Sequence, residues 1–379
     1  MCGAEKIMTN FIPVNEPLLD GNEKKYLTEC IDTGWISSEG PFVRRFEEAF
    51  AARMGRKHGI AVCNGTAALD AAVETLGIGP GDEVILPTFT IISCINQIVR
   101  SGATPVLVDT DPLTWNMDVT QIEAKVTPHT KAIMVVHIYG LPVDMNPVLD
   151  ICERHGLKLI EDAAQAIGQT YRGSPCGSYG DISTVSFYPN KHVTTGEGGM
   201  ILTDDDDLAE NCRELRNLCF KPGKRFVHER LGWNLRMTNM QAALGLAQLE
   251  RLDEFVTKKR AIGQRYTELL SGLPGVQLPL ARTKYAENIY WVYGLVLNEK
   301  IGFNAEEAMK RLATRGIGSR PFFYPMHQQP ILRKMTLFIN ESYPVAERMS
   351  RQGFYIPSGM ALTEEQIRII TDTFRKVFA

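Results

Sequence analysis

The segment TVSFYPNKHVTTGEGGMILT, residues 184–203, places a lysine in a loop rich in threonine and glycine between two apolar runs. The flanking runs, residues 184–188 and 199–203, predict two strands. A lysine in such a loop, when partly desolvated or close to another cation, can lose its proton near neutral pH and attack a carbonyl to form a Schiff base. The alternative is a solvated surface lysine, because most lysines are exposed. Lys191 is therefore our candidate nucleophile.

Outward from this segment, short apolar runs rich in valine and isoleucine alternate with segments of helical periodicity between His58 and Thr203. The predicted strands are residues 59–63, 83–87, 105–109, 132–138, 158–161, 184–188 and 199–203. The runs are almost continuously hydrophobic, so we expect both faces of the sheet to be covered. The pattern predicts an α/β fold with a mostly parallel central sheet flanked by helices.

The chain has 379 residues, more than the ~250 to 300 that a single hydrophobic core usually reaches. A long helical pattern begins at Met237 and continues past Arg260. After it, residues 289–297 predict a strand, residues 305–315 predict a helix and a terminal helix begins at Thr363. We therefore expect a large domain over residues 1–250 and a small C-terminal α+β domain over residues 251–379.

Composition narrows the range of partners. The 41 basic and 44 acidic residues give a formal net charge of -3, without a basic block that would follow a nucleic-acid backbone. No apolar run reaches the ~18 residues needed to span a bilayer. The eight cysteines form no C-x-x-C pair and are expected to be reduced thiols. The histidine spacing gives no support for a metal site. We expect a cytoplasmic protein that binds neither nucleic acid nor a membrane.

A second motif, CNGTAAL at residues 63–69, joins a buried strand to a helix through small residues. The unpaired N–H groups of a helix N-terminus can bind a phosphate. Gly65 would let the backbone approach it, and Thr66 would add a hydroxyl. The alternative is a tight turn in which Asn64 or Thr66 is a plain helix cap.

A third motif, LIEDAAQ at residues 159–165, ends an apolar strand in two carboxylates. Open α/β sheets bind their ligands at this edge. Adjacent strand residues face opposite sides, so only one of Glu161 and Asp162 can point into a given pocket. This disfavours a hydrolase with paired carboxylates and favours one acid with one partner, such as a cationic ring nitrogen. An exposed acid that caps the next helix is the alternative.

The order of these three motifs resembles the fold-type I enzymes that use pyridoxal 5'-phosphate (PLP). The stretches EDAA (161–164), TTGEGG (194–199) and NLRMT (234–238) resemble the DegT/DnrJ/EryC1/StrS sugar aminotransferase family, over nearly the whole chain. The stretches LDGNE (19–23), WISS (35–38) and SRPFFYPMH (319–327) are similar to the branch of that family that makes GDP-perosamine.

The resemblance implies a role for each motif residue. Lys191 would bind PLP as a Schiff base and then carry the proton between the amino donor and the cofactor. Asp162 would pair with the pyridine nitrogen and Gln165 with the ring hydroxyl. Three residues would hold the phosphate: Gly65, Thr66 and Ser186. Asn234 would contact the phosphate of the neighbouring subunit's cofactor, so the resemblance implies a homodimer with shared active sites.

Two further expectations concern the rest of the pocket. In PTFTIIS, residues 87–93, Ile91 stands where the family usually has an aromatic residue that stacks on PLP, so it would cover the ring by apolar contact alone. The candidates for contact with the sugar or its diphosphate are Trp35, Arg320, Tyr324 and His327. The alternatives are that the aromatics of residues 322–324 belong to the core and that His327 is structural.

The implied reaction has two halves. L-glutamate would convert PLP to pyridoxamine 5'-phosphate and leave as 2-oxoglutarate. The amino group would then pass to C4 of GDP-4-keto-6-deoxy-D-mannose and give GDP-perosamine. One alternative is a UDP-linked 4-keto-6-deoxy sugar as acceptor. Another is the dehydratase branch of the family, which has a histidine in place of the lysine, although here Lys191 is present and His192 stands beside it. A third is a PLP-binding regulator without catalytic activity.

Overall fold

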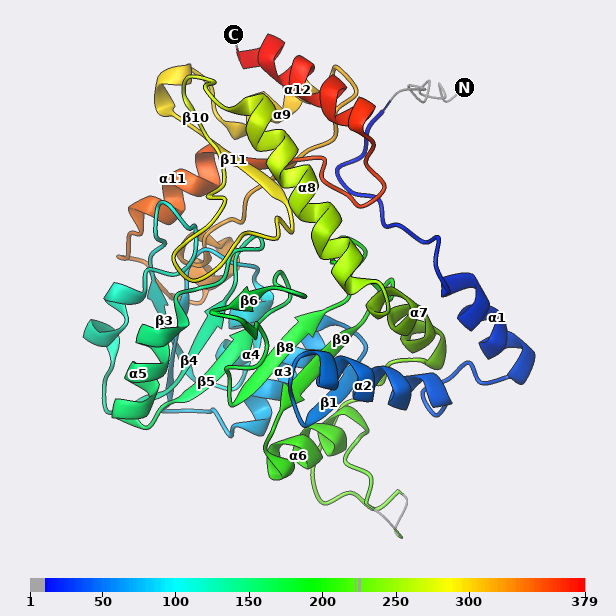
Figure 1. Ribbon diagram of the computed structural model, residues 1–379. Helices are drawn as coiled ribbons and strands as arrows, with labels where there is room; N and C mark the ends of the chain where they lie inside the picture. The colour runs from blue at the N-terminus through cyan, green and yellow to red at the C-terminus, as the bar shows by residue number, and fades with distance from the viewer. Residues whose placement is uncertain (1–10, 222, 224–225, 379) are drawn as a thin grey trace, which may run out of the picture.

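The computed structural model describes residues 11–221, 223 and 226–378, and its centre is a seven-stranded sheet (Figure 1). The strand order is β1-β9-β8-β5-β4-β2-β3. The strands are β1 His58–Val62, β2 Glu83–Pro87, β3 Thr104–Val108, β4 Thr130–Val136, β5 Lys158–Asp162, β8 Ile182–Ser186 and β9 Gly199–Thr203. β9 runs antiparallel to both of its neighbours, and the other pairings are parallel. The predicted mostly parallel sheet is confirmed, with every predicted strand within two residues of its expected bounds.

Helices cover both faces of this sheet, as the continuous apolar runs predicted. Along β2, Val84 and Leu86 belong to a core shared with α3 and α4, whereas Ile85 belongs to a core shared with α2, α5 and α7. Successive strand residues face opposite sides, so an unbroken apolar strand can supply both cores. The helices of this part are α1 Glu23–Thr33, α2 Pro41–Arg53, α3 Gly65–Thr75, α4 Ser93–Arg100, α5 Met145–His155, α6 Asp206–Arg216 and α7 Asn239–Leu249.

The predicted single long helix from Met237 is wrong, because the structure divides it into α7 and α8 (Leu252–Leu270). α7 begins with a capping box in which the side chains of Thr238 and Gln241 bond each other's backbone N–H groups. Between the helices, Arg251 leaves the helical conformation with φ -112° and ψ 12°. Its guanidinium binds Asp20 near the N-terminus and Glu254 in the first turn of α8. This tertiary ion pair accompanies a break that helical periodicity alone does not predict.

α8 leads from the large sheet to a second, antiparallel sheet with the order β10-β11-β13-β12 (Figure 1). Its strands are β10 Val276–Gln277, β11 Tyr293–Leu297, β12 Arg320–Pro321 and β13 Gly353–Ile356. The helices of this part are α9 Ala305–Ala313, α10 Pro330–Lys334, α11 Pro344–Gln352 and α12 Glu364–Phe378. Side chains of α8, α9 and α12 share a separate apolar core with β11 and β13. The predicted strand and helices of this part are present; the domain division at residue 250 stays a prediction.

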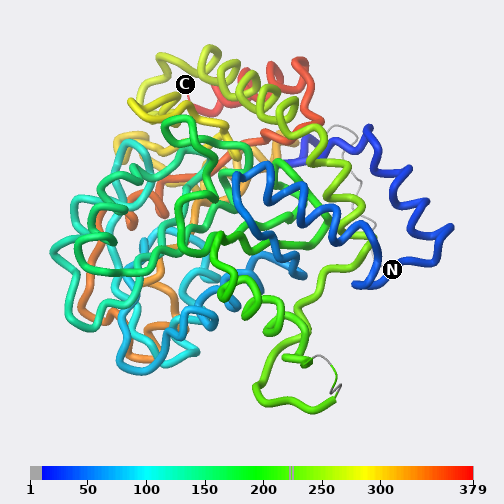
Figure 2. The backbone as a smooth tube through the Cα atoms, turned by 60° about the horizontal axis from the view of Figure 1, so that its bottom comes forward, coloured from blue at the N-terminus to red at the C-terminus, as the bar shows by residue number. Residues whose placement is uncertain are grey.

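Smaller features complete the fold. A short hairpin of β6 (Thr170–Tyr171) and β7 (Ser174–Pro175) precedes β8. The segment between α6 and α7 projects from the molecule (Figure 2). All seven cysteines that the structure describes are free thiols, and Cys2 lies outside the described residues. Among the helices that the structure describes, none combines the length and the apolar composition needed to cross a membrane.

Candidate active site

A cavity of about 740 Å³ opens at the carboxyl ends of β5 and β8. Parallel strands commonly present their ligand-binding residues at this edge. Most of the residues predicted to bind the cofactor line this one cavity: Gly65, Thr66, Ile91, Asp162, Gln165, Ser186 and Lys191. Residues separated by more than 120 positions in the sequence therefore meet at one site.

The first turn of α3 borders the cavity. Asn64 is the helix cap, and its Oδ1 accepts a hydrogen bond from the Ala67 N–H at 2.8 Å. The capping interpretation is thus correct for Asn64, while Gly65 and Thr66 still line the cavity. A Cβ added at Gly65 would lie 2.6 Å from the Cβ of Ser186, so only glycine lets this turn approach β8 so closely. A helix N-terminus beside two hydroxyl side chains suits a phosphate.

The two carboxylates at the end of β5 separate as expected. Asp162 lines the cavity and is only 4% exposed. Its Oδ1 accepts from the Ala164 N–H at 3.0 Å, and its Oδ2 accepts from the thiol of Cys94 at 3.4 Å. Burial raises the pKa of Asp162, and the Ala164 amide and the charge of Lys191 oppose that rise. The carboxylate is oriented on one side by protein donors and borders the cavity on the other.

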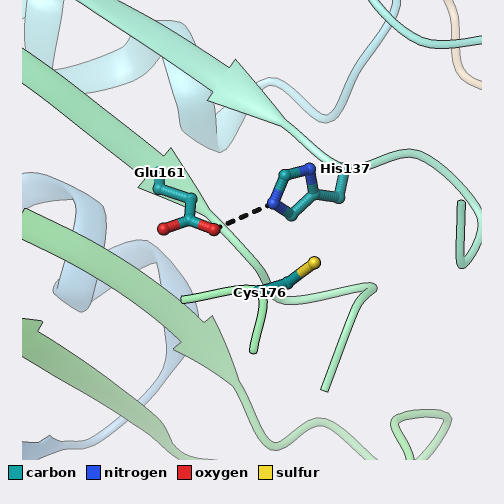
Figure 3. Close-up of side chains that lie close together, drawn as sticks. All are labelled: His137, Glu161 and Cys176. Atoms are coloured by element: carbon teal, nitrogen blue, oxygen red, sulfur yellow. Dashed lines mark hydrogen bonds and ion pairs between the residues drawn. The ribbon is translucent and has the colours of Figure 1, made fainter. Parts of the chain in front are cut away.

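Glu161 points to the other side of β5, where it meets His137 and Cys176 (Figure 3). Three potential metal-ligand atoms gather here from residues that are distant in sequence. However, His137 donates to Glu161 from Nε2 at 3.0 Å, and its Nδ1 accepts from the Val143 N–H at 3.2 Å. The Glu161 carboxylate also accepts bonds from Gly177, Tyr179, Gly180 and Ser183. His137 and Glu161 thus belong to a buried hydrogen-bond network that holds the segment after β7.

Lys191 lies in the loop after β8 and lines the cavity. Burial lowers its pKa to about 7, against the opposing influence of Asp162 and Cys94. Its Nζ lies 3.7 Å from the centroid of the Trp291 ring. The interpretation as a solvated surface lysine is therefore wrong. An amine with this pKa is partly neutral at physiological pH and can act as a nucleophile or a base.

None of the predicted substrate residues is among the residues that line the cavity. Trp35 and Tyr324 are each 49% exposed. Arg320 pairs with Tyr355 in the β12–β13 register, and Tyr355 lines the cavity. His327 is buried: one ring nitrogen bonds the Thr88 hydroxyl at 2.8 Å and the other bonds Glu347 at 3.0 Å. The structural interpretation of His327 thus describes its position.

Asn234 does not line the cavity of its own chain. Its Oδ1 accepts from the Arg236 Nε at 2.9 Å, in the segment that leads into α7. The predicted contact of Asn234 with the cofactor of a neighbouring subunit stays a prediction.

Sequence analysis missed several residues that line the cavity. Trp291, Phe323 and Tyr355 come from the C-terminal part of the chain, and Asn190 and Thr184 flank the strand and loop that carry Lys191. Phe323 lies in a quoted motif, but its neighbours in sequence gave no reason to place it at the cofactor site. Trp291 had no signal beyond its apolar segment, because only the packing of β11 against the lysine loop brings it there.

Comparison with known proteins is consistent with this geometry. The model of the DegT/DnrJ/EryC1/StrS aminotransferase family matches residues 17–375. The chain is 46% identical to the GDP-perosamine synthase of Caulobacter vibrioides, with 94% of this chain and 95% of the relative covered. It is 41% identical to the GDP-perosamine synthase of Vibrio cholerae, with 97% of this chain and 99% of the relative covered.

Among solved structures, the putative sugar aminotransferase Spr1654 of Streptococcus pneumoniae in its PLP form superposes with a TM-score of 0.90. The sequence identity is 25%, and the match covers 97% of this chain and 98% of that one. The family match spans both sheets and all three motifs of the site. This chain belongs to the DegT/DnrJ/EryC1/StrS aminotransferase family.

Proposed function

We propose that the protein is a PLP-dependent aminotransferase that moves the amino group of L-glutamate to C4 of GDP-4-keto-6-deoxy-D-mannose, giving GDP-perosamine and 2-oxoglutarate. The observation that carries this proposal is the meeting of Lys191 and Asp162 in one cavity beside the N-terminus of α3. The GDP sugar is favoured over a UDP sugar because relatives named GDP-perosamine synthase are 46% and 41% identical over nearly the full chain.

The residues of the cavity fit PLP. The first turn of α3 and Ser186 would hold the phosphate, Asp162 the ring nitrogen and Gln165 the ring hydroxyl. Two buried oxygen atoms of the cavity wall, Thr184 Oγ1 and Asn190 Oδ1, have no hydrogen-bond partner among the described residues. Buried polar atoms are rarely left unpaired, so these atoms support the presence of a polar ligand. When bound, PLP supplies a carbonyl carbon that takes up the amino group and a ring that withdraws electrons.

The two ionisable side chains divide the proton chemistry. The Asp162 carboxylate would keep a proton on the ring nitrogen, because a negative charge within contact distance favours the cationic form of its partner. In the first half-reaction Lys191 Nζ, with a pKa of about 7, would accept the proton from the α-carbon of glutamate and donate it to the cofactor carbon that takes up the amino group. In the second half-reaction it would move a proton from that cofactor carbon to C4 of the sugar. Ile91, which lines the cavity, would cover the ring by apolar contact.

The nucleotide would enter on the side formed by the second sheet. We propose that Arg320 meets the diphosphate, since it is exposed and pairs with the cavity residue Tyr355. Guanidinium groups match phosphate oxygens in charge and geometry. Trp35 and Tyr324 remain proposed contacts to the sugar or base. His327 would act indirectly, by holding Thr88 at the start of the segment that leads from β2 to Ile91.

We further propose a homodimer. The segment that projects between α6 and α7 carries Val227, 56% exposed, and Leu231, 95% exposed (Figure 2). Apolar side chains on a projecting segment indicate contact with another surface. Asn234 follows them in the same segment and lies away from the cavity of its own chain.

Subunit mixing tests the shared site. If Asn234 serves the partner's cofactor, mixing inactive K191A chains with weakened N234A chains should restore activity, because each mixed dimer contains one site with both native residues. No gain in activity over the unmixed variants, with dimers confirmed by light scattering, would contradict the shared site.

The proposed reaction is tested by absorption spectroscopy of the purified protein with PLP. L-glutamate should replace the visible band of lysine-bound PLP by the band of pyridoxamine phosphate, and GDP-4-keto-6-deoxymannose should restore it. Recovery only with the UDP-glucose counterpart would keep the aminotransferase and change its substrate. K191A should lose the visible band and nearly all turnover, whereas K158A, which changes a lysine on the far end of β5, should keep both. A native-like band in K191A would overturn the role of Lys191.

A further inference from the structure

The indole of Trp291 lies directly against the candidate nucleophile. Trp291 precedes β11, lines the cavity and is 5% exposed. The Nζ of Lys191 lies 3.7 Å from the centroid of its ring. This distance is well within the ~6 Å over which an aromatic face attracts a cation. Neither the local sequence around the lysine nor the strand motifs indicated such a contact.

Three contacts fix the orientation of this ring. The indole Nε1–H donates to the carbonyl of Asn190, the residue before the lysine, at 2.8 Å. The ring of Tyr139 stacks on it with a centroid distance of 6.0 Å and an interplanar angle of 26°. The ammonium of Lys259, buried in α8, donates to the Trp291 carbonyl at 2.8 Å. Side chain and backbone are thus held independently, and the face of the ring stays on the lysine.

Few neighbouring groups stabilise a positive charge on Lys191 Nζ, so the contact with the Trp291 ring matters for its protonation. Burial disfavours the positive charge of Nζ, and Asp162 is its main anionic neighbour. Cys94 of α4 stays neutral because burial raises its pKa, and His192 stays neutral because burial lowers its pKa to about 3. The other titratable groups of the cavity wall are Cys63, Asp70, Tyr188, Glu197 and Tyr355. Asp162 and Cys94 oppose the effect of burial on the Lys191 pKa, and the aromatic face of Trp291 adds a direct contact that favours a cation at this nitrogen.

We propose that Trp291 is a positioning residue for Lys191: its indole face holds the lysine ammonium when the lysine is free and favours a protonated nitrogen when the lysine is bound to the cofactor. This inference rests on the proposed function. The strength of the effect should follow the electrostatics of the ring face, which is greatest for tryptophan, smaller for phenylalanine and absent for leucine.

The test is a pH titration of the visible band of lysine-bound PLP in the holoenzyme, without substrate. W291L should lower the midpoint by about half a unit to one unit, since removal of the ring face destabilises the protonated nitrogen. W291F should give a smaller fall. The matched control is W115F, because Trp115 is equally buried, lies outside the cavity wall and has no partner for its Nε1 among the described residues. W115F should titrate as the wild type does.

The outcomes separate the two proposals. If W291L does not retain PLP, the test uses the pH midpoint of the visible band in W291F. An unchanged midpoint in W291F would then overturn the positioning role. Normal titration of W291L with reduced turnover would also overturn it and would indicate a purely steric or substrate-binding role. If the wild type itself shows no visible band with PLP, the proposed function fails. If the wild-type band responds to glutamate while residue 291 leaves its midpoint unchanged, only this inference fails.

Discussion

At the scale of single residues, Glu161 and Asp162 show how strand geometry separates two identical functional groups. Asp162 borders the cavity, and burial raises its pKa. Burial alone would also raise the pKa of Glu161, but the hydrogen bond from His137 and the amides of Gly177 and Tyr179 outweigh it and hold that pKa below its usual range. Asp162 is therefore available to a ligand, whereas the hydrogen-bonding capacity of Glu161 is used within the protein.

We expect E161Q to lower the free energy of unfolding by about 2 to 4 kcal/mol, because an amide cannot accept all the bonds that the buried carboxylate accepts. The pKa of Glu161 lies below its usual 4.5, so its stabilisation is present above that pH and is lost as the pH falls through the lower value of the folded state. The gap between wild type and variant, measured by urea unfolding, should therefore shrink below about pH 4.5.

The control is E123Q, since the side chain of Glu123 is 47% exposed in its ion pair with Arg154. Exposed pairs contribute little, so E123Q should lower the free energy of unfolding far less than E161Q at neutral pH. The role assigned to Glu161 would be wrong if E161Q cost no more than the control.

At the scale of elements, the start of α3 determines whether the site can hold a phosphate. Its position depends on Asn64, which caps the helix, and on Gly65, which packs against Ser186. The cap satisfies one free N–H group of the first turn and leaves others available. A local motif thus fixes the start of α3. The distance between this start and Ser186 of β8 fixes the shape of the proposed phosphate site.

We expect G65A to weaken PLP binding by about tenfold or more, because the new methyl would lie 2.6 Å from the Ser186 Cβ and must push α3 away from β8. PLP titration followed by absorption measures this. G79A is the matched control, since its methyl would meet nothing closer than the Ser101 carbonyl at 3.8 Å. Equal PLP affinity in the two variants would contradict the proposed phosphate site at Gly65.

At the scale of the whole molecule, a buried lysine of α8 binds the segments that flank two strands of the second sheet. The ammonium of Lys259 donates to the carbonyls of Trp291, before β11, and Ser358, after β13. Burial lowers the pKa of Lys259 to about 7 from its usual 10.5. The hydrogen bonds of one buried amine therefore connect α8, the second sheet and the tryptophan that faces Lys191.

This burial predicts a pH dependence of stability. Between pH 7 and about 10 the unfolded chain binds the Lys259 proton and the folded chain does not, so the contribution of this group to stability rises with pH. In urea unfolding of the holoenzyme, wild type should gain stability relative to K259M by up to about 1.4 kcal/mol per pH unit in this range. K24M, at an exposed lysine of α1, should follow the wild type. Parallel pH curves for wild type and K259M would contradict the assignment.

The sequence by itself determined the strands of the large sheet, a helix start within the CNGTAAL motif and the three motifs of the site, while the choice of Asn64 over Thr66 as the cap came from the structure. These features depend on residues within a few positions of one another, through apolar periodicity, capping and turn chemistry. The family motifs could also be recognised from the sequence, because each is a continuous stretch of chain.

Only the tertiary structure decided the break between α7 and α8, the burial of His327 and the arrival of Trp291 and Tyr355 at the cavity. Each depends on partners more than a hundred residues away, such as Asp20 for Arg251 and Thr88 for His327. Local sequence carries no record of such contacts, because they form only when separate elements pack together and bury their side chains against one another.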